Sequence, residues 1–486
     1  MNWRWIINRL SHLLAIEACG MLPPLLVSLG YRDGETLTFV LSIAILAALA
    51  LITRAVRPHK QEVFAKEGLA LGGCGWFLMT ALGALPYLLS PRFITYADAF
   101  FEAAAGFSTT GASVLYAAVD GEYGLSRGLL LWRGLTQWMG GLGFLVMIVA
   151  VVPSTQTGAL HVLRAESTGP SVEKFVPKVR QHARILYIIY TALTVSLAGI
   201  LIALGMPVFE AACYALGTIS TGGFTVDNGL ASYGSPAIET TVAIFMLLAG
   251  VNFAVYYLIA QRRWRDLARY EELRLYLGVV AVSTLFVGIS VFRDVYATVG
   301  ESARRAFFQV ASIVTTTAYP IADYAKWPAF SQGMLLALML VGGCAGSTTG
   351  AVKMIRWLLL FKAAKRETYR ILHPRVRRSV TLNGRAVEDE TLLGAMVFMI
   401  LYFLTVLGLA LVVSLDGKDV TTNLTAAIAC VGNIGPGLGL VGPAGSYAGF
   451  SARSKMFLSV GMIVGRLEIY PVLILCSPAF WKRVNI

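Results

Sequence analysis

The chain has 486 residues, of which 57% are hydrophobic and only 14% are charged. This composition excludes an ordinary soluble domain and indicates a protein that crosses a membrane several times. A net charge of +13 would normally raise nucleic acid as a partner, but the placement of the basic residues favours a membrane protein that binds no nucleic acid.

Ten apolar runs approach or exceed the roughly 20 residues that a membrane-spanning helix needs. They cover 5–29, 37–52, 68–89, 128–152, 185–204, 242–260, 276–291, 333–361, 392–415 and 456–476. The first run follows two arginines and is too long for a secretion signal, so we expect it to remain as a span. The predicted fold class is an all-α polytopic membrane protein embedded in a lipid bilayer.

Lysine and arginine concentrate in alternate connections between these runs. The basic connections are 53–60, 164–184, 261–269 and 362–378. Two of the other connections, 206–236 and 416–450, contain a single basic residue between them, Lys418. The remaining two contain several arginines and a lysine, so the contrast is weaker there. This asymmetry is the positive-inside pattern, and it predicts that both termini and the four basic loops are cytoplasmic. Docking of a cytosolic partner on these loops is the alternative reading.

A short motif of hydroxyl residues and glycine recurs four times. Aligned on Gly111, the copies are FSTTGA (107–112), ISTGGF (219–224), VTTTAY (314–319) and VGNIGP (431–436). Each copy lies between apolar runs, and the segment leading into it has only about 12 residues, too few to cross a bilayer as a helix. We therefore predict four repeats of helix, half-helix, extended loop and helix. They cover 65–152, 180–262, 270–365 and 388–480, after two additional N-terminal helices in 1–60.

The four loops have the chemistry of a filter for a monovalent cation. Non-helical backbone at membrane depth is stable only when protein buries it or when it lines a watery cavity, so we expect the loops to meet around one axis. Glycine permits positive φ, the short helices point their negative ends inward, and uncharged oxygens can replace a hydration shell. The predicted filter residues are Thr109, Thr110, Gly111, Thr221, Gly222, Gly223, Thr316, Thr317, Ala318, Asn433, Ile434 and Gly435. Ordinary close packing of small residues is the alternative for any single copy.

A glycine-rich stretch below the third loop predicts a gate. The segment VGGCAGSTTGAVK (341–353) interrupts an apolar run, and each glycine costs about 1 kcal/mol in a helix, so we expect the helix to break there. The gate residues in this stretch are Gly342, Gly343, Gly346, Ser347, Thr348, Thr349, Gly350 and Lys353. Lys353 favours a water-lined position. A packing kink is the structural alternative.

Arg466 and Glu468 lie near the middle of the last apolar run. An ionisable residue at that depth is costly and is read as functional by default. Two residues apart on a helix, the side chains do not face each other, and each needs its own partner. A buried ion pair that only locks helices together is the alternative, especially for Glu468.

With these motifs the chain resembles the Trk/Ktr/HKT superfamily of potassium transporters and, within it, the bacterial TrkH/TrkG-type uptake subunits. The resemblance implies four repeats that each fold like one potassium-channel subunit, a homodimer, and gating by a cytoplasmic nucleotide-binding ring of the TrkA type. It assigns filter glycines to Gly111, Gly223 and Gly435. It also assigns Arg466 to the gate, as an electrostatic barrier that projects below the filter toward the glycine-rich loop. Ala318 departs from the family's usual glycine, which predicts that one wall of the filter is narrowed or tilted.

The function that we predict is potassium uptake across the bacterial inner membrane, with K⁺ as the transported ion and no organic cofactor. A secondary cation transporter, proton-coupled (a symport) or sodium-permeable, is the alternative, because Glu468 is available to carry a proton. A membrane-embedded enzyme would need a cluster of acids, bases or metal ligands. The six cysteines and five histidines form none, so we expect no enzyme activity.

Overall fold

The computed structural model describes residues 1–56, 65–91, 93, 95–115, 124–143, 179–226, 229–374 and 379–481. Two sets of sequence predictions lie outside these ranges. One is part of three basic loops, at 57–60, 164–178 and 375–378. The other is the end of the first predicted repeat, at 144–152.

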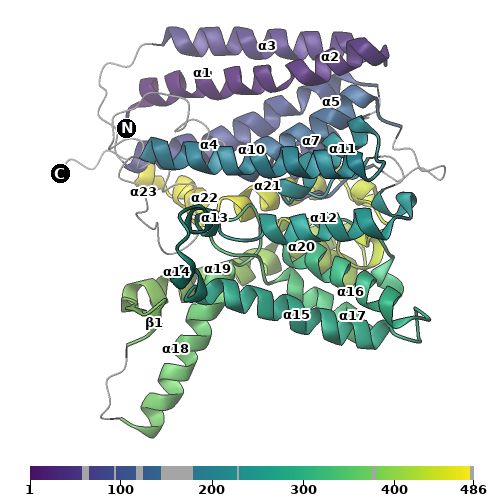
Figure 1. The fold of residues 1–486 in the computed structure, drawn as a ribbon. Helices are drawn as coiled ribbons and strands as arrows, with labels where there is room; N and C mark the ends of the chain where they lie inside the picture. Colours follow the sequence, from purple (N-terminus) through teal and green to yellow (C-terminus); the bar gives the residue numbers. More distant parts are fainter. Residues whose placement is uncertain are drawn as a thin grey trace.

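Three N-terminal helices form a layer along one side of the bundle (Figure 1). They are α1 (Trp3–Gly20), α2 (Leu22–Tyr31) and α3 (Thr36–Ala55). Proline in the first turn of α2 starts a new helix after Met21, because proline has no N–H to donate back into α1. The buried faces of α1 and α3, including Leu14 and Phe39, belong to the main hydrophobic core.

The order long helix, short helix, loop and second helix then occurs four times, in four consecutive stretches of the chain. The first stretch contains α4 (Ala65–Gly83), α5 (Leu85–Leu89), α6 (Tyr96–Phe107) and α7 (Arg127–Gly141). The second contains α10 (Val179–Ala203), α11 (Val208–Ile219), α12 (Pro236–Ala249) and α13 (Phe253–Ala260), followed by α14 (Trp264–Ala268). The third contains α15 (Glu271–Val291), α16 (Val299–Val314), α17 (Ala329–Met339) and α18 (Met354–Leu372). The fourth contains α19 (Asp389–Val413), α20 (Val420–Val431), α21 (Ala452–Arg466) and α22 (Tyr470–Cys476), followed by α23 (Pro478–Trp481).

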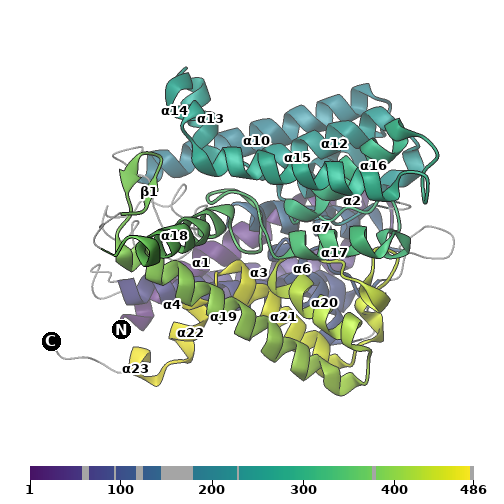
Figure 2. The same ribbon diagram turned by 90° about the horizontal axis from the view of Figure 1, so that it is seen from below.

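The stretches surround the centre of the molecule, with α10, α12, α15 and α16 of the second and third on one side and α19, α20 and α21 of the fourth on the other (Figure 2). The lower part of α18 projects from the bundle, next to a hairpin of β1 (Thr381–Leu382) and β2 (Arg385–Ala386). Asn383 and Gly384 form its turn with φ values of 50° and 80°, the left-handed geometry that two-residue hairpin turns require.

The short helices α6, α11, α16 and α20 end at the predicted loops. Three of them have 12 residues, as the sequence predicts, whereas α16 has 16. Side chains fix three of the starting points: Thr95, Thr298 and Asp419 each accept a hydrogen bond from a backbone N–H in the first helical turn. Such caps satisfy donors that have no partner within the helix.

The sequence predicted one broken span, at 341–353, and this break is confirmed between α17 and α18. Its prediction of continuous spans at 242–260 and 456–476 is wrong. The pair α12 and α13 bends by 92°, and the pair α21 and α22 bends by 118°. The first break follows from Asn252, which caps α13, and the second from left-handed backbone at Glu468 and Ile469.

The outer faces of the long helices are apolar. In α19, Leu393, Ile400 and Leu411 are each about 60% exposed, whereas Phe398 and Tyr402 on the other face are buried. An exposed apolar surface of this kind is the surface that lipid tails cover. Among the described residues, six helical stretches are long and apolar enough to cross a membrane, and eight if each bent pair is one span.

Candidate functional site

The four motif loops begin in the same register. In each, the aligned residue (Gly111, Gly223, Ala318 or Gly435) comes four positions after the end of the short helix. A backbone N–H of every loop donates to the carbonyl six residues before the aligned position; the acceptors are Ala105, Gly217, Ser312 and Ala429. The loops therefore turn back over the C-terminal ends of their own helices.

The loop backbone is left-handed at every second position. The aligned residues have φ values of 75°, 78°, 56° and 100°, as the sequence predicts for glycine. The residues two positions earlier are also left-handed; they are Thr109, Thr221, Thr316 and Asn433. Ala318 adopts this geometry although it carries a Cβ, which costs an ordinary residue about 1–2 kcal/mol.

The loops form a closed ring. A methyl group added at Gly111 would collide with the Gly222 carbonyl oxygen, and one added at Gly223 with that of Thr317. At Gly435 it would lie 2.5 Å from the carbonyl oxygen of Thr110 in the first loop. The first loop thus lies against the second, the second against the third, and the fourth against the first. The ring closes where Tyr324, which follows the third loop, donates to the Gly437 carbonyl of the fourth at 3.2 Å.

Hydroxyl and amide groups brace the ring. Asn433 donates to Thr110 Oγ1 across the boundary between the fourth and first loops, at 3.0 Å. In the third loop the Thr315 and Thr317 hydroxyls are 2.9 Å apart. Thr109 Oγ1 is buried and has no hydrogen-bond partner among the described residues. The twelve predicted filter residues are all buried except Gly111, which is half-buried.

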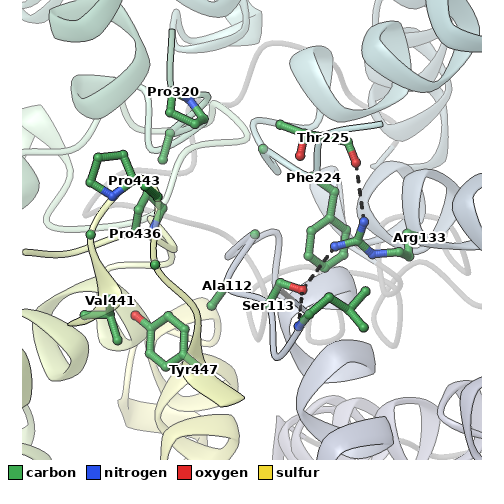
Figure 3. Close-up of a pocket in the computed structure, with 17 residues that line it drawn as sticks. Ala112, Ser113, Arg133, Phe224, Thr225, Pro320, Pro436, Val441, Pro443 and Tyr447 are labelled. Carbon is green, nitrogen blue, oxygen red and sulfur yellow. Dashed lines mark hydrogen bonds between the residues drawn. The ribbon is translucent and has the colours of Figure 1, made fainter. Parts of the chain in front are cut away.

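A cavity of about 90 Å³ opens where the loops leave the ring (Figure 3). Residues that follow the aligned positions in all four loops line it, among them Ala112, Phe224, Pro320 and Pro436. Arg133 from α7 also reaches its wall. The ring therefore has one open side.

The glycine-rich segment between α17 and α18 covers the opposite side. The Gly350 N–H donates to Thr316 Oγ1 at 2.8 Å, and the Ala351 N–H donates to the Gly432 carbonyl at 2.8 Å. Thr348 Oγ1 donates to the carbonyl of Ile219, the last residue of α11, at 3.2 Å. Residues 342–350 are buried except Gly346, which is exposed. The predicted gate segment is thus bonded to three of the four stretches.

Arg466 and Glu468 have different partners, as the sequence predicts. The Arg466 guanidinium donates to the carbonyls of Thr348 and Gly140, each at 2.7 Å, and also to that of Gly141. It thereby ties the segment to the end of α7. Glu468 forms an ion pair with Arg356 on α18.

Lys353 does not have the water-lined position that the sequence favoured. It is only 2% exposed, and its ammonium donates to the carbonyl and hydroxyl of Thr349. The reason is that α18 restarts directly after Lys353, so the side chain folds back over the loop.

Two buried side chains that the sequence analysis missed hold these parts in place. Glu272, at the start of α15, accepts hydrogen bonds from the N–H groups of Ala345 and Ile355, at 2.6 Å and 3.1 Å, and so fixes both ends of the glycine-rich segment. Gln137 on α7 donates to the Gly222 carbonyl at 2.6 Å. An acid at the start of an apolar run is the only signal that the sequence offered for Glu272.

The described residues contain no group of three or more His, Cys, Asp or Glu side chains arranged to hold a metal ion. The oxygens of the ring are instead backbone carbonyls and hydroxyls. Such neutral oxygens suit a weakly held monovalent ion.

Comparisons with known proteins agree with this geometry. Residues 35–483 match the TrkH family, described as "Cation transport protein". The chain is 35% identical to "Trk system potassium uptake protein TrkH" of Salmonella typhimurium, over 98% of this chain and 99% of that protein. It is 31% identical to "Trk system potassium uptake protein TrkG" of Escherichia coli, over 99% of both.

The crystal structure of the potassium transporter TrkH from Vibrio parahaemolyticus has the same fold. It superposes with a TM-score of 0.88 at 31% identity and covers 99% of this chain and 100% of that one. The predicted fold class, an all-α polytopic membrane protein, is confirmed.

Proposed function

Because the chain belongs to the TrkH family of cation transport proteins, we propose that it carries potassium ions into the cell through a pore along the axis of the four-loop ring. The chain is a multi-pass membrane protein, and we place it in the bacterial inner membrane with both termini in the cytoplasm. The four stretches act as pore repeats at 65–152, 180–262, 270–365 and 388–480.

One observation carries this proposal: four loops in one register close into a ring, with left-handed backbone at the same two positions of each. The carbonyls and hydroxyls of residues 109–111, 221–223, 316–318 and 433–435 replace the water around a dehydrated ion. The C-terminal ends of α6, α11, α16 and α20 add partial negative charge toward the centre. Neutral ligands bind the ion weakly enough that it can leave again.

We infer that the glycine-rich segment and Arg466 form the gate, and that the position of the segment under the ring corresponds to the closed gate. The segment lies under the ring, bonded to α11, α20 and Thr316. Arg466 fastens the segment and adds a positive charge below the filter, which opposes the passage of a cation. Opening requires that the segment withdraw.

Two partners complete the proposed assembly: a second copy of the chain, and a cytosolic nucleotide-binding ring of the TrkA type. The projecting part of α18 and the adjacent hairpin support the second, because they extend out of the bundle and connect directly to the gate segment (Figure 1). A force applied to α18 reaches Lys353 and the segment without an intervening loop.

A sodium-permeable filter is a second candidate, and Ala318 favours it. Its methyl group occupies a position where the other three loops have glycine. Relaxing the ring around this methyl group would admit ions with less discrimination.

The test is uptake of radioactive rubidium into liposomes that contain the purified protein, with potassium, sodium or lithium as competitors. Arg466→Gln is assayed beside the wild type, so that a closed gate is not mistaken for a missing pore. Gly111→Ser should abolish discrimination between potassium and sodium. Gly229→Ser is its matched control, because both glycines have φ of 75° but Gly229 has open space around it.

Uptake that potassium blocks and sodium hardly affects supports the potassium proposal. Equal competition by sodium in the wild type would replace it with the sodium-permeable candidate. Uptake that requires an imposed pH gradient would favour proton coupling instead. No uptake even in Arg466→Gln would contradict the pore.

A further inference from the structure

A buried ion pair lies behind the outer end of the filter. Arg133 on α7 and Glu102 on α6 are 2% and 0% exposed, and Arg133 Nη2 is 2.7 Å from Glu102 Oε1. Arg133 Nε donates to the same carboxylate oxygen at 2.8 Å. The pair is not part of the predicted filter or gate, and its position in the core requires a reason, because burying two charges is costly.

The pair contacts the exits of two neighbouring filter loops, and Figure 3 shows the bonds of Arg133 to Ser113 and Thr225. Glu102 accepts hydrogen bonds from the Val114 N–H at 3.2 Å and from the Ser113 hydroxyl at 3.0 Å, both in the first loop. Arg133 donates to the carbonyl of Thr225 in the second loop, at 3.4 Å. Its guanidinium also lies 3.9 Å from the centre of the Phe224 ring. The pair thus joins the first loop to the second.

The other three loops are held at the same place by other chemistry. The tethered residue is always the third after the aligned position, and the tether always comes from the loop's own short helix. Tyr214 donates to the Val226 carbonyl, Arg305 to the Ile321 carbonyl, and Thr425 bonds the N–H and carbonyl of Leu438. Because the equivalent residue of every loop is bonded to that loop's own short helix, we infer that the outer end of each loop must be fixed.

The pair also keeps the cavity wall neutral. Arg133 lines the cavity through which an ion would reach the ring, and a lone positive charge there would repel a cation. The carboxylate of Glu102 offsets that charge at contact distance. The planar guanidinium is needed for the geometry, because one group must face Glu102, Ser113 and Thr225 together.

We propose that Glu102 and Arg133 are positioning residues that set the discrimination between potassium and sodium by clamping the outer ends of the first two filter loops together. The inference rests on the proposed function. Neither side chain touches the ion; both act through the backbone of residues 113–114 and 225.

Arg133→Lys is the decisive variant, because it keeps the charge and loses the planar fork. We expect it to retain rubidium uptake but to let sodium compete about tenfold better, a change of about 1.4 kcal/mol in relative affinity. Ser113→Ala removes the hydroxyl that bonds to both Glu102 and Arg133, without changing any charge. It should shift the sodium-to-potassium competition ratio in the same direction by a smaller factor.

Asp98→Asn is the matched control. Asp98 lies one turn before Glu102 on α6 and forms a partly buried ion pair with Lys455, at 2.6 Å, which holds α6 to α21 instead of holding a filter loop. Loss of this ion pair should leave the sodium-to-potassium competition ratio unchanged. Size-exclusion profiles in detergent establish that each variant is folded.

Competition ratios of Arg133→Lys and Ser113→Ala that stay within about twofold of the wild type, a difference of less than about 0.5 kcal/mol, would overturn the inference. An equally large change in the competition ratio of Asp98→Asn would also overturn the inference, because loss of any ion pair on α6 would then weaken the discrimination. If wild type and Arg466→Gln both lack potassium-sensitive uptake, the proposed function fails first, and the inference with it. Each variant is therefore assayed both alone and combined with Arg466→Gln.

Discussion

Replacement of Gly435 by alanine should open the filter at the boundary between the fourth and first repeats. The added methyl carbon would lie 2.5 Å from the Thr110 carbonyl oxygen and 3.0 Å from the carbonyl carbon of Gly111. An ordinary van der Waals separation is about 3.5 Å, so the Thr110 carbonyl must move by about 1 Å. The left-handed backbone adds about 1–2 kcal/mol of strain.

Gly205 separates these two effects. Its φ of 94° is close to the 100° of Gly435, but no atom lies within 4 Å of an added methyl group. Gly205→Ala therefore carries the strain without the collision. We expect Gly435→Ala to lose at least as much thermal stability as Gly205→Ala, because it adds the collision to the strain. Only Gly435→Ala should lose discrimination, by about tenfold or more in the rubidium uptake assay.

The uptake assay with potassium and sodium as competitors decides the matter, and thermal unfolding in detergent checks the stability of both variants. If Gly435→Ala discriminates as well as Gly205→Ala, the Thr110 carbonyl does not belong to the filter and the ring geometry has no role in selection.

Three further variants test other parts of the pore. Arg466→Gln removes the bonds that fasten the gate segment, so rubidium uptake without a cytosolic partner should rise several-fold; unchanged uptake would contradict its role. Gly350→Ala places a methyl group against the Gly432 carbonyl and 2.8 Å from Asn433 Cβ, and should also raise uptake, whereas lower uptake would mean that the segment shifts toward the filter. Ala318→Gly relieves about 1–2 kcal/mol of strain, partly offset by the entropy that glycine adds to the unfolded chain. It should lower sodium competition at nearly constant thermal stability, and unchanged competition would show that the methyl group does not widen the ring.

The register of the loops was predictable because local signals determine it. Four positions before Gly111 or Gly435 the short helix ends, and the residues that follow are small or carry hydroxyls. Positive φ at the aligned positions follows from glycine itself. The aligned alanine, Ala318, adopts the same geometry although its own preference is against it. Bonds from α16 hold the loop there: the Ala318 N–H donates to the Ser312 carbonyl, and the Ser312 hydroxyl donates to the Tyr319 carbonyl. That these residues select an ion stays a prediction.

The breaks in the second and fourth repeats were not predictable, because distant residues produce them. Asn252 and Phe253 stop α12 where the Phe253 N–H donates to the Gly346 carbonyl of the third repeat. No pattern near 242–260 reveals that acceptor. The same holds for Glu102 and Arg133, whose partner in the second loop, Thr225, lies 92 residues beyond Arg133. Sequence periodicity identifies a helix and its buried face, but it does not identify the partner of a buried charge.

The proposed gate segment is bonded to polar groups at and directly below the proposed filter, and in our proposal this limits how the pore can open. The carbonyls of Ile219 and Gly432, at the ends of α11 and α20, accept bonds from the gate segment, and so does the Thr316 hydroxyl. These are the groups whose partial negative charge would stabilise a cation below the ring. Withdrawal of the segment frees them, and buried acceptors without partners are costly. A hydrated cation entering at that moment supplies the missing partner. On the proposed mechanism, the gate segment and the permeating ion are therefore alternative partners of one set of oxygens.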